Sequence, residues 1–241
     1  MKISVMLMIL LMIGAIYSCN GVASQEESPL IAGELDYIIL PEPELDGNIS
    51  VERALANRRS HRSFRDRALS KEQLSQILWA AYGITEPIAD SPGLRGGLRT
   101  TPSAGATYPL EIYAIVGNVY GLEPGVYRYI SDGHKLIKIV AGDVREELME
   151  AAVGQRMVAD APVTIFYSAV FERTTGRYGE RGIKYVYIEI GHSAQNVYLQ
   201  AEAMGLGTCA IGAFIDNSVR LILNLPANEE PLYMMPVGYI N

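Results

Sequence analysis

Arg58-Arg59-Ser60-His61-Arg62-Ser63-Phe64 is the stretch from which we interpret the whole chain. Three arginines within five residues stand out here, because the protein is acidic overall, with 20 Lys and Arg against 27 Asp and Glu. A guanidinium carries a fixed charge and a planar set of donors that matches phosphate oxygens. The stretch therefore predicts a phosphate-binding segment, and the alternative is a solvated basic end of a helix.

The composition limits the classes of protein to consider. A chain of 241 residues with 49% apolar and 20% charged residues is long enough for one sizeable globular domain. The formal charge of −7 disfavours a general nucleic-acid role, which needs a broad basic face. The two cysteines and three histidines do not have the spacing of metal ligands, so no metal site is predicted.

The N-terminal segment has the features of a targeting signal. Lys2 precedes a nearly unbroken apolar run from Ile3 to Ile16, which is short for a spanning helix. The following Tyr17-Ser18-Cys19 resembles a lipoprotein cleavage box, and the alternative is an uncleaved anchor. We therefore expect a signal peptide or lipoprotein anchor over 1–19 with lipidation at Cys19, a flexible tether over 20–37, and a domain over 38–241. This organisation predicts membrane attachment at the extracytoplasmic face of the cell envelope.

Capping residues and periodicity place the main elements. Ser50 is suited to cap a short helix that runs into the arginines, and Ser70 with Gln73 has the spacing of a capping box. The Gly/Pro/Ser-rich stretch 83–109 has no clear periodicity and is predicted to be a functional loop. The charged stretch 171–182 is predicted to be a mobile flap. Strands are predicted over 110–116, 125–129, 135–140, 163–170 and 232–238, and further helices over 144–153, 183–204 and 216–223.

Four motifs occur in the order seen in the nitroreductase superfamily, and their wording resembles its SagB-type or thiazole/oxazole-forming branch. The resemblance covers roughly 38–241, and the motifs are Arg58-Arg59-Ser60-x-Arg62-x-Phe64, Pro102-Ser103-Ala104-Gly105-Ala106, Gly205-Leu206-Gly207 through Ile211-Gly212-Ala213-Phe214, and Met235-Pro236-Val237-Gly238-Tyr239. The resemblance implies an α+β fold with a central, mainly antiparallel sheet flanked by helices. It also implies an interlocked homodimer with two FMN sites at the subunit interface.

The same resemblance implies which residues bind the cofactor. The flavin phosphate and ribityl oxygens would meet Arg58, Ser60 and Arg62, and the backbone around Gly212 and Ala213 would face the flavin N5. The Pro102–Ala106 motif would come from the partner subunit. The full implied set is Arg58, Arg59, Ser60, Arg62, Pro102, Ser103, Ala104, Gly105, Ala106, Gln155, Ala210, Ile211, Gly212 and Ala213.

The chain departs from the family pattern at two positions. It ends at Asn241 without the basic residues that many members carry after the last strand, so Arg99 is a candidate helper at the phosphate. Ala106 replaces a polar residue common in nitroreductases, which favours the SagB-like branch.

Four further side chains carry groups that could take part in chemistry. Lys184-Tyr185 resembles the pair that azoline-oxidising members use to remove a proton beside the flavin. The alternative is an ordinary helix start with a surface lysine and a packing tyrosine. His192 is interpreted as a satisfied structural histidine, and Cys209 as a small buried residue rather than a nucleophile.

Together these features predict an FMN-dependent oxidoreductase that passes hydride through flavin N5 to or from a small organic substrate. In the first version it is a SagB-type dehydrogenase with Lys184 and Tyr185 as base and proton relay. In the second it is a nitro- or quinone-reducing enzyme that takes its electrons from NAD(P)H. A third alternative, of another class, is a membrane-tethered flavin- or solute-binding lipoprotein without turnover.

Overall fold

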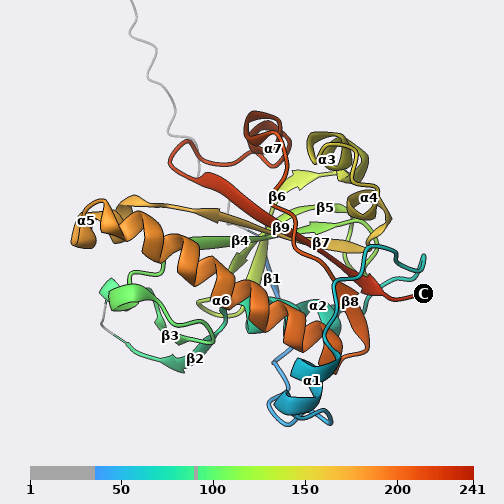
Figure 1. The fold of residues 1–241 in the computed structure, drawn as a ribbon, viewed down its shortest axis with the longest axis horizontal. Coiled ribbons are helices and arrows are strands. Elements are labelled where there is room, and N and C mark those ends of the chain that lie inside the picture. Colours follow the sequence, from blue (N-terminus) through green and yellow to red (C-terminus); the bar gives the residue numbers. More distant parts are fainter. Residues whose placement is uncertain (1–35, 90–91) are drawn as a thin grey trace, which may run out of the picture. The chain divides into compact units, whose positions relative to one another are not determined.

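A seven-stranded antiparallel sheet forms the centre of the computed structural model, which describes residues 36–89 and 92–241 (Figure 1). Its strand order is β1-β6-β5-β4-β7-β9-β8, and each neighbouring pair runs antiparallel, which confirms the predicted sheet. The strands are β1 (Tyr37–Ile39), β4 (Leu110–Val116), β5 (Gly125–Ile130), β6 (Lys135–Ala141), β7 (Val163–Ala169), β8 (Leu206–Thr208) and β9 (Glu230–Tyr239).

Helices cover both faces of this sheet (Figure 1). The central strands β4 and β7 are buried along their whole length, and their alternating side chains enter two separate cores. The first core includes Ile112, Ile77 and Val197, and the second includes Tyr113 and Val219. One face carries α1 (Val51–Asn57), α2 (Lys71–Tyr82), α5 (Glu172–Tyr178) and α6 (Arg181–Ala203), and the other carries α3 (Arg145–Ala151), α4 (Met157–Asp160) and α7 (Asp216–Ile222).

The two predicted helix caps are confirmed. Ser50 Oγ accepts a hydrogen bond from the Arg53 amide at 3.2 Å, which starts α1. Ser70 and Gln73 form the reciprocal capping box that starts α2. Because α1 ends at Asn57, the arginine-rich segment begins at the C-terminal end of a helix rather than within one.

Two predicted irregular segments contain regular structure instead. The stretch 83–109 holds a hairpin of β2 (Ile84–Pro87) and β3 (Gly97–Arg99) and the short 3₁₀ turns η1 (Pro92–Leu94) and η2 (Ala104–Ala106). The predicted flap at 171–182 is wrong, because α5 occupies most of it and packs on α6. A side chain at Gly182 would place its Cβ 2.9 Å from the Thr175 backbone, so only glycine allows the two helices to meet this closely.

The interpretation as a membrane-anchored lipoprotein is corrected here. None of the helices in residues 36–89 and 92–241 is long and apolar enough to cross a membrane. The segment 1–19 and almost all of the predicted tether lie outside the residues that the structure describes. The structure thus gives no support for a signal peptide, a lipidated Cys19 or membrane attachment, and the function proposed below does not use them.

Candidate functional site

The arginine-rich segment lies along the edge strand β8. Ser60 forms an isolated parallel bridge with Thr208, and the His61 amide donates to the Thr208 carbonyl at 2.9 Å. This pairing fixes the backbone of the segment, while Arg62 remains exposed and Arg58 half-buried. The segment therefore presents cationic side chains from a rigid backbone.

Tyr198 of α6 joins this segment to the glycine-containing loop that follows β8. The Arg58 guanidinium carbon lies 5.1 Å from the centroid of the Tyr198 ring, in the geometry of a cation–π contact. The Tyr198 hydroxyl lies 3.1 Å from Ser60 Oγ and accepts a hydrogen bond from the Ala210 amide at 2.8 Å. Two motifs predicted to bind one cofactor thus share a single tyrosine that the sequence did not single out for this role.

The loop 210–213 is held on both sides. Ile211 exchanges two backbone hydrogen bonds with Met234 of β9, at 2.8 and 3.0 Å. Gln155 Nε2 donates to the Ala213 carbonyl at 3.0 Å, which brings this predicted contact residue to the loop. Gly212 and Ala213 are exposed. Their backbone is therefore fixed by the protein and accessible from outside.

Arg59 differs from the other two arginines in its surroundings. Its Nη1 donates to the carbonyls of Ala56, Asn57 and Arg58 at 3.1, 3.3 and 2.8 Å. These are carbonyls at the end of α1, where a cation also interacts favourably with the helix dipole. Within one chain Arg59 thus caps a helix, whereas Arg62 makes no side-chain hydrogen bond or ion pair among the described residues.

The Pro102–Ala106 motif forms a loop with an unusual backbone. Gly105, Ala106 and Tyr108 have φ values of 58°, 54° and 46°, and alanine and tyrosine seldom adopt this left-handed conformation. The Tyr108 amide donates to Ser103 Oγ at 2.9 Å, and Arg177 of α5 donates to the Gly105 carbonyl at 3.0 Å. The loop is therefore held in a strained shape against α5.

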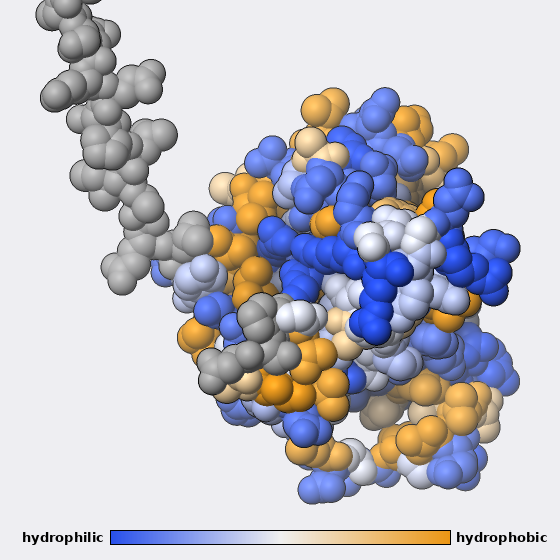
Figure 2. Space-filling view, turned by 90° about the vertical axis from the view of Figure 1, so that its left-hand side faces the viewer, coloured by the Kyte–Doolittle hydropathy of each residue, from blue (hydrophilic) through white to orange (hydrophobic). Residues whose placement is uncertain are grey.

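The predicted Lys184-Tyr185 pair lies beside this second loop. Tyr185 packs edge-to-face on Tyr178 at 5.1 Å between ring centroids, and the Tyr178 hydroxyl lies against Gly105. Lys184 is exposed. In a single chain the pair is thus a surface lysine and a packing tyrosine, as the alternative interpretation predicted. Figure 2 views the molecule from the side on which α5 lies, where hydrophilic side chains run between hydrophobic areas.

The predicted site residues therefore form two half-sites. The first contains Arg58, Ser60, Arg62, Gln155 and the loop 210–213, near Tyr198. The second contains the Pro102–Ala106 loop with Lys184 and Tyr185. Tyr185 and Tyr198 lie on the same helix, and a rise of about 1.5 Å per residue separates them by about 20 Å along its axis.

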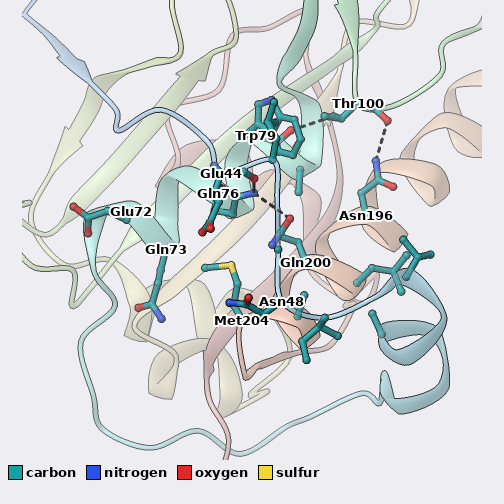
Figure 3. A pocket seen from close by; sticks show the side chains of 18 of the residues that line it. Glu44, Asn48, Glu72, Gln73, Gln76, Trp79, Thr100, Asn196, Gln200 and Met204 are labelled. Atoms are coloured by element: carbon teal, nitrogen blue, oxygen red, sulfur yellow. Dashed lines mark hydrogen bonds between the residues drawn. The ribbon is translucent and has the colours of Figure 1, made fainter.

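A cavity of about 880 Å³ lies between α1, α2, α6 and the segment that precedes α1 (Figure 3). Trp79, Asn196 and Gln200 line it, and Gln76 links the Glu44 backbone to Gln200 by hydrogen bonds. Its lining among the described residues includes Glu42, Glu44 and Glu72 and no lysine, arginine or histidine. This cavity does not suit a phosphate, and none of the predicted site residues lines it.

The structure also tests the interpretations of Arg99, Cys209 and His192. Arg99 is not available to a phosphate, because its guanidinium lies between the rings of Tyr82 and Tyr108 and donates to the Tyr82 carbonyl at 3.1 Å. Cys209 is confirmed as a small buried residue, and burial raises the pKa of its thiol. The interpretation of His192 as a satisfied structural histidine is wrong, because its side chain is exposed.

Comparisons of the sequence and of the structure with known proteins agree on one protein family. The model of the nitroreductase family matches residues 55–239. A protein of Methanocaldococcus jannaschii, provisionally named a nitroreductase, is 47% identical over 206 residues, which cover 86% of this chain and 98% of that protein. The trifolitoxin operon protein TfxC of Rhizobium leguminosarum is 27% identical over 86% of this chain and 60% of its own length. A crystal structure of a provisionally named nitroreductase from Ralstonia eutropha superposes with a TM-score of 0.71 at 28% identity, over 85% of this chain and 90% of that one.

Proposed function

Because the chain belongs to the nitroreductase family, we propose that it is an FMN-dependent oxidoreductase of the SagB-type branch and that it acts as a homodimer. The observation that carries this proposal is the division of the predicted site into two half-sites at opposite ends of α6. One chain does not bring its two half-sites together at a single cofactor. Two copies in opposite orientation bring the first half-site of one chain to the second half-site of the other.

The first half-site fits the phosphate end of FMN. Arg58 and Arg62 carry fixed charges, and Ser60 adds a hydroxyl, so this set matches a dianionic phosphate. The exposed backbone of Gly212 and Ala213 is held by β9 and Gln155, so it can approach the flat ring without a bulky side chain in the way. These residues would bind and orient the cofactor.

The second half-site fits a partner's flavin. Its loop presents small residues and is fixed by Arg177 and Tyr178. The neighbouring surface of α6 exposes Tyr187 and Ile188, each 54% accessible. Large apolar side chains in this position favour contact with another protein surface, and a second copy of the chain places them against its own α6.

Bound FMN would supply hydride transfer at its N5 position. The chain's own contribution would be to exclude water, orient the substrate and handle a proton. A lysine acts as a base when burial disfavours its charged form, and Lys184 is exposed in one chain, so the partner subunit must provide that burial. Tyr185 lies next to it on α6 and can relay the proton.

A second candidate is an NAD(P)H-dependent reductase of nitro compounds or quinones. It is favoured by the 47% identity to the provisionally named nitroreductase and by the exposed position of Lys184. Such a reaction needs no base from the protein at the substrate carbon. Lys184→Ala separates the two candidates, because it should abolish dehydrogenase activity and largely preserve reduction of an organic acceptor.

The proposed function is tested on the purified protein. Size-exclusion chromatography with light scattering measures its oligomeric state, and absorbance after addition of FMN measures cofactor uptake. Anaerobic NADH or NADPH should bleach the flavin, and an added quinone should restore its colour. A colourless dimer that takes up no FMN would overturn the proposal, and a flavin that no donor reduces would instead indicate a binding protein.

A further inference from the structure

The cavity of about 880 Å³ beside α1 has no role in the function proposed above. Its wall on α6 comes from the C-terminal part of that helix, namely Asn196, Leu199, Gln200 and Ala203. Three large apolar residues that also line it are in contact with solvent, since Leu45 is 74%, Val51 63% and Ile49 42% exposed. Exposed apolar side chains around a cavity favour contact with another protein surface.

The lining of this cavity is acidic. It includes Glu42, Glu44 and Glu72 and, among the described residues, no basic side chain (Figure 3). None of the three carboxylates forms an ion pair within the part of the chain that the structure describes. Carboxylates that share a cavity repel one another, and a cation placed among them is attracted by all of them. The cavity therefore fits an occupant that carries positive charge.

The opposite end of α6 has the complementary character (Figure 1). Arg181 and Lys184 at its start are exposed, as is Arg177 of the preceding helix α5. The exposed acids of the same stretch are fewer, namely Glu172 and Glu180. Arg181 forms no ion pair with any described residue, and the neighbouring Ile183 is 41% exposed. This end of the helix thus offers the positive charge and the apolar side chain that the cavity lacks.

These two ends cannot meet within one chain. A rise of about 1.5 Å per residue separates Arg181 from Gln200 by about 28 Å along the helix axis. Two copies of α6 in opposite orientation can bring them together, and Gly191 near the middle of the helix is a suitable crossing point. It is exposed, and open space lies where its Cβ would be, so a second helix can approach closely there.

A crossing at Gly191 fixes the register of the two helices. Arg181 of one copy then lies beside residue 201 of the other, because each is ten residues from Gly191, and residue 201 lies within the stretch that lines the cavity. The same register sets Tyr185 opposite residue 197, next to Tyr198. It therefore also brings together the two half-sites, although it was derived from the cavity and the glycine alone.

We propose that the cavity receives the first turn of α6 from a second copy of the chain, so that the partner's Arg181 lies against Glu44 and the other carboxylates of the lining. This inference rests on the proposed homodimer and assigns the surfaces that form it. The acidic cavity and the basic helix start lie at opposite ends of one helix, so two copies make two equivalent contacts and the assembly closes. Because these contacts are between charges, the dimer should weaken as the salt concentration rises.

Charge reversal tests this contact. Glu44→Arg and Arg181→Glu each place like charges together at two equivalent contacts, and each should weaken dimerisation about tenfold in sedimentation velocity at low salt. The double variant restores opposite charges and should return to within about threefold of wild type. Glu150→Arg is the control, because Glu150 is exposed on α3, which covers the other face of the sheet, and it should leave dimerisation unchanged. Single variants that dimerise like wild type, or additive losses in the double variant, would overturn the proposal.

Trp79 provides a second measurement that needs no substitution. It is the only tryptophan of the chain and lines the cavity, so its emission should shift to shorter wavelength as the dimer forms and water leaves the cavity. A dimer that forms without any change in this emission would overturn the proposal, and the cavity would then belong to another occupant. If wild type is monomeric at every concentration, the proposed homodimer fails as well. A dimer that binds FMN but is insensitive to both charge reversals refutes this inference alone.

Discussion

Replacing Tyr198 by phenylalanine tests whether the arginine segment and the loop after β8 form one half-site. The substitution keeps the aromatic ring, and therefore the cation–π contact with Arg58, but removes the hydroxyl that bridges Ser60 and Ala210. The Ala210 amide then loses its hydrogen-bond acceptor. The Ser60 hydroxyl loses its only side-chain partner among the described residues.

The expected cost follows from the burial of these groups. Leaving a buried amide unpaired costs about 1–3 kcal/mol, and Ala210 is half-buried, so the lower part of that range, about 1–2 kcal/mol, applies. For a domain of this size each kcal/mol lowers Tm by about 2–4 °C, which gives a decrease of about 2–8 °C. FMN affinity should also fall by about threefold to tenfold, because Ser60 and the loop are no longer held at a fixed separation.

Thermal unfolding and an FMN fluorescence titration measure the two effects. Tyr239→Phe is the matched control, since the Tyr239 hydroxyl also bonds a neighbouring side chain, that of Gln73, at 2.9 Å. The control should lose stability but retain FMN affinity. If Tyr198→Phe leaves both Tm and FMN affinity unchanged, the tyrosine does not couple the two motifs, and the reasoning is refuted.

Three further predictions concern charge, backbone and pH. Arg62→Gln should weaken FMN binding at least about tenfold, as expected for a charge-assisted hydrogen bond, whereas Arg65→Gln, at a residue that is also exposed, should change it little; isothermal titration compares them. Gly105→Ala should cost about 1 kcal/mol in urea unfolding, because φ is 58° and a new Cβ would meet the Tyr178 hydroxyl. Burial lowers the pKa of His134 below its ordinary value of 6.5. At pH values between this lowered pKa and 6.5, the native state therefore binds fewer protons than the unfolded state. Stability should therefore fall as pH drops below 6.5, and His134→Gln should flatten this dependence in urea titrations at pH 5–7.

Local signals in the sequence predicted the fold well. Ser50 and Ser70 cap helices because the bond that each makes lies within the next three residues, and such bonds need no tertiary information. The helix α5 was missed because its sequence, Glu172 to Tyr178, is polar and contains Gly176, so no apolar stripe reveals it. Its stability comes from packing on α6, which the local sequence does not contain.

The partners of site residues were less predictable. The ring of Tyr198 lies against the core, but its hydroxyl contacts residues 12 and 138 positions away in the sequence. Arg99 was a candidate helper at the phosphate, by comparison with the pattern of the family. The hairpin of β2 and β3 instead turns it inward between two tyrosines. Such outcomes depend on which strands pair, and that is decided by the whole fold.

The helix α6 supports each half-site from a different flank. Tyr185 packs on Tyr178 beside the Pro102–Ala106 loop, and Tyr198 holds the arginine segment. At about 100° per residue, these two side chains leave the helix about 140° apart. Both supports lie on one continuous helix, which holds the two half-sites about 20 Å apart along its axis. In the proposed dimer, a second α6 in the opposite orientation would bring each half-site of one chain to the complementary half-site of the other.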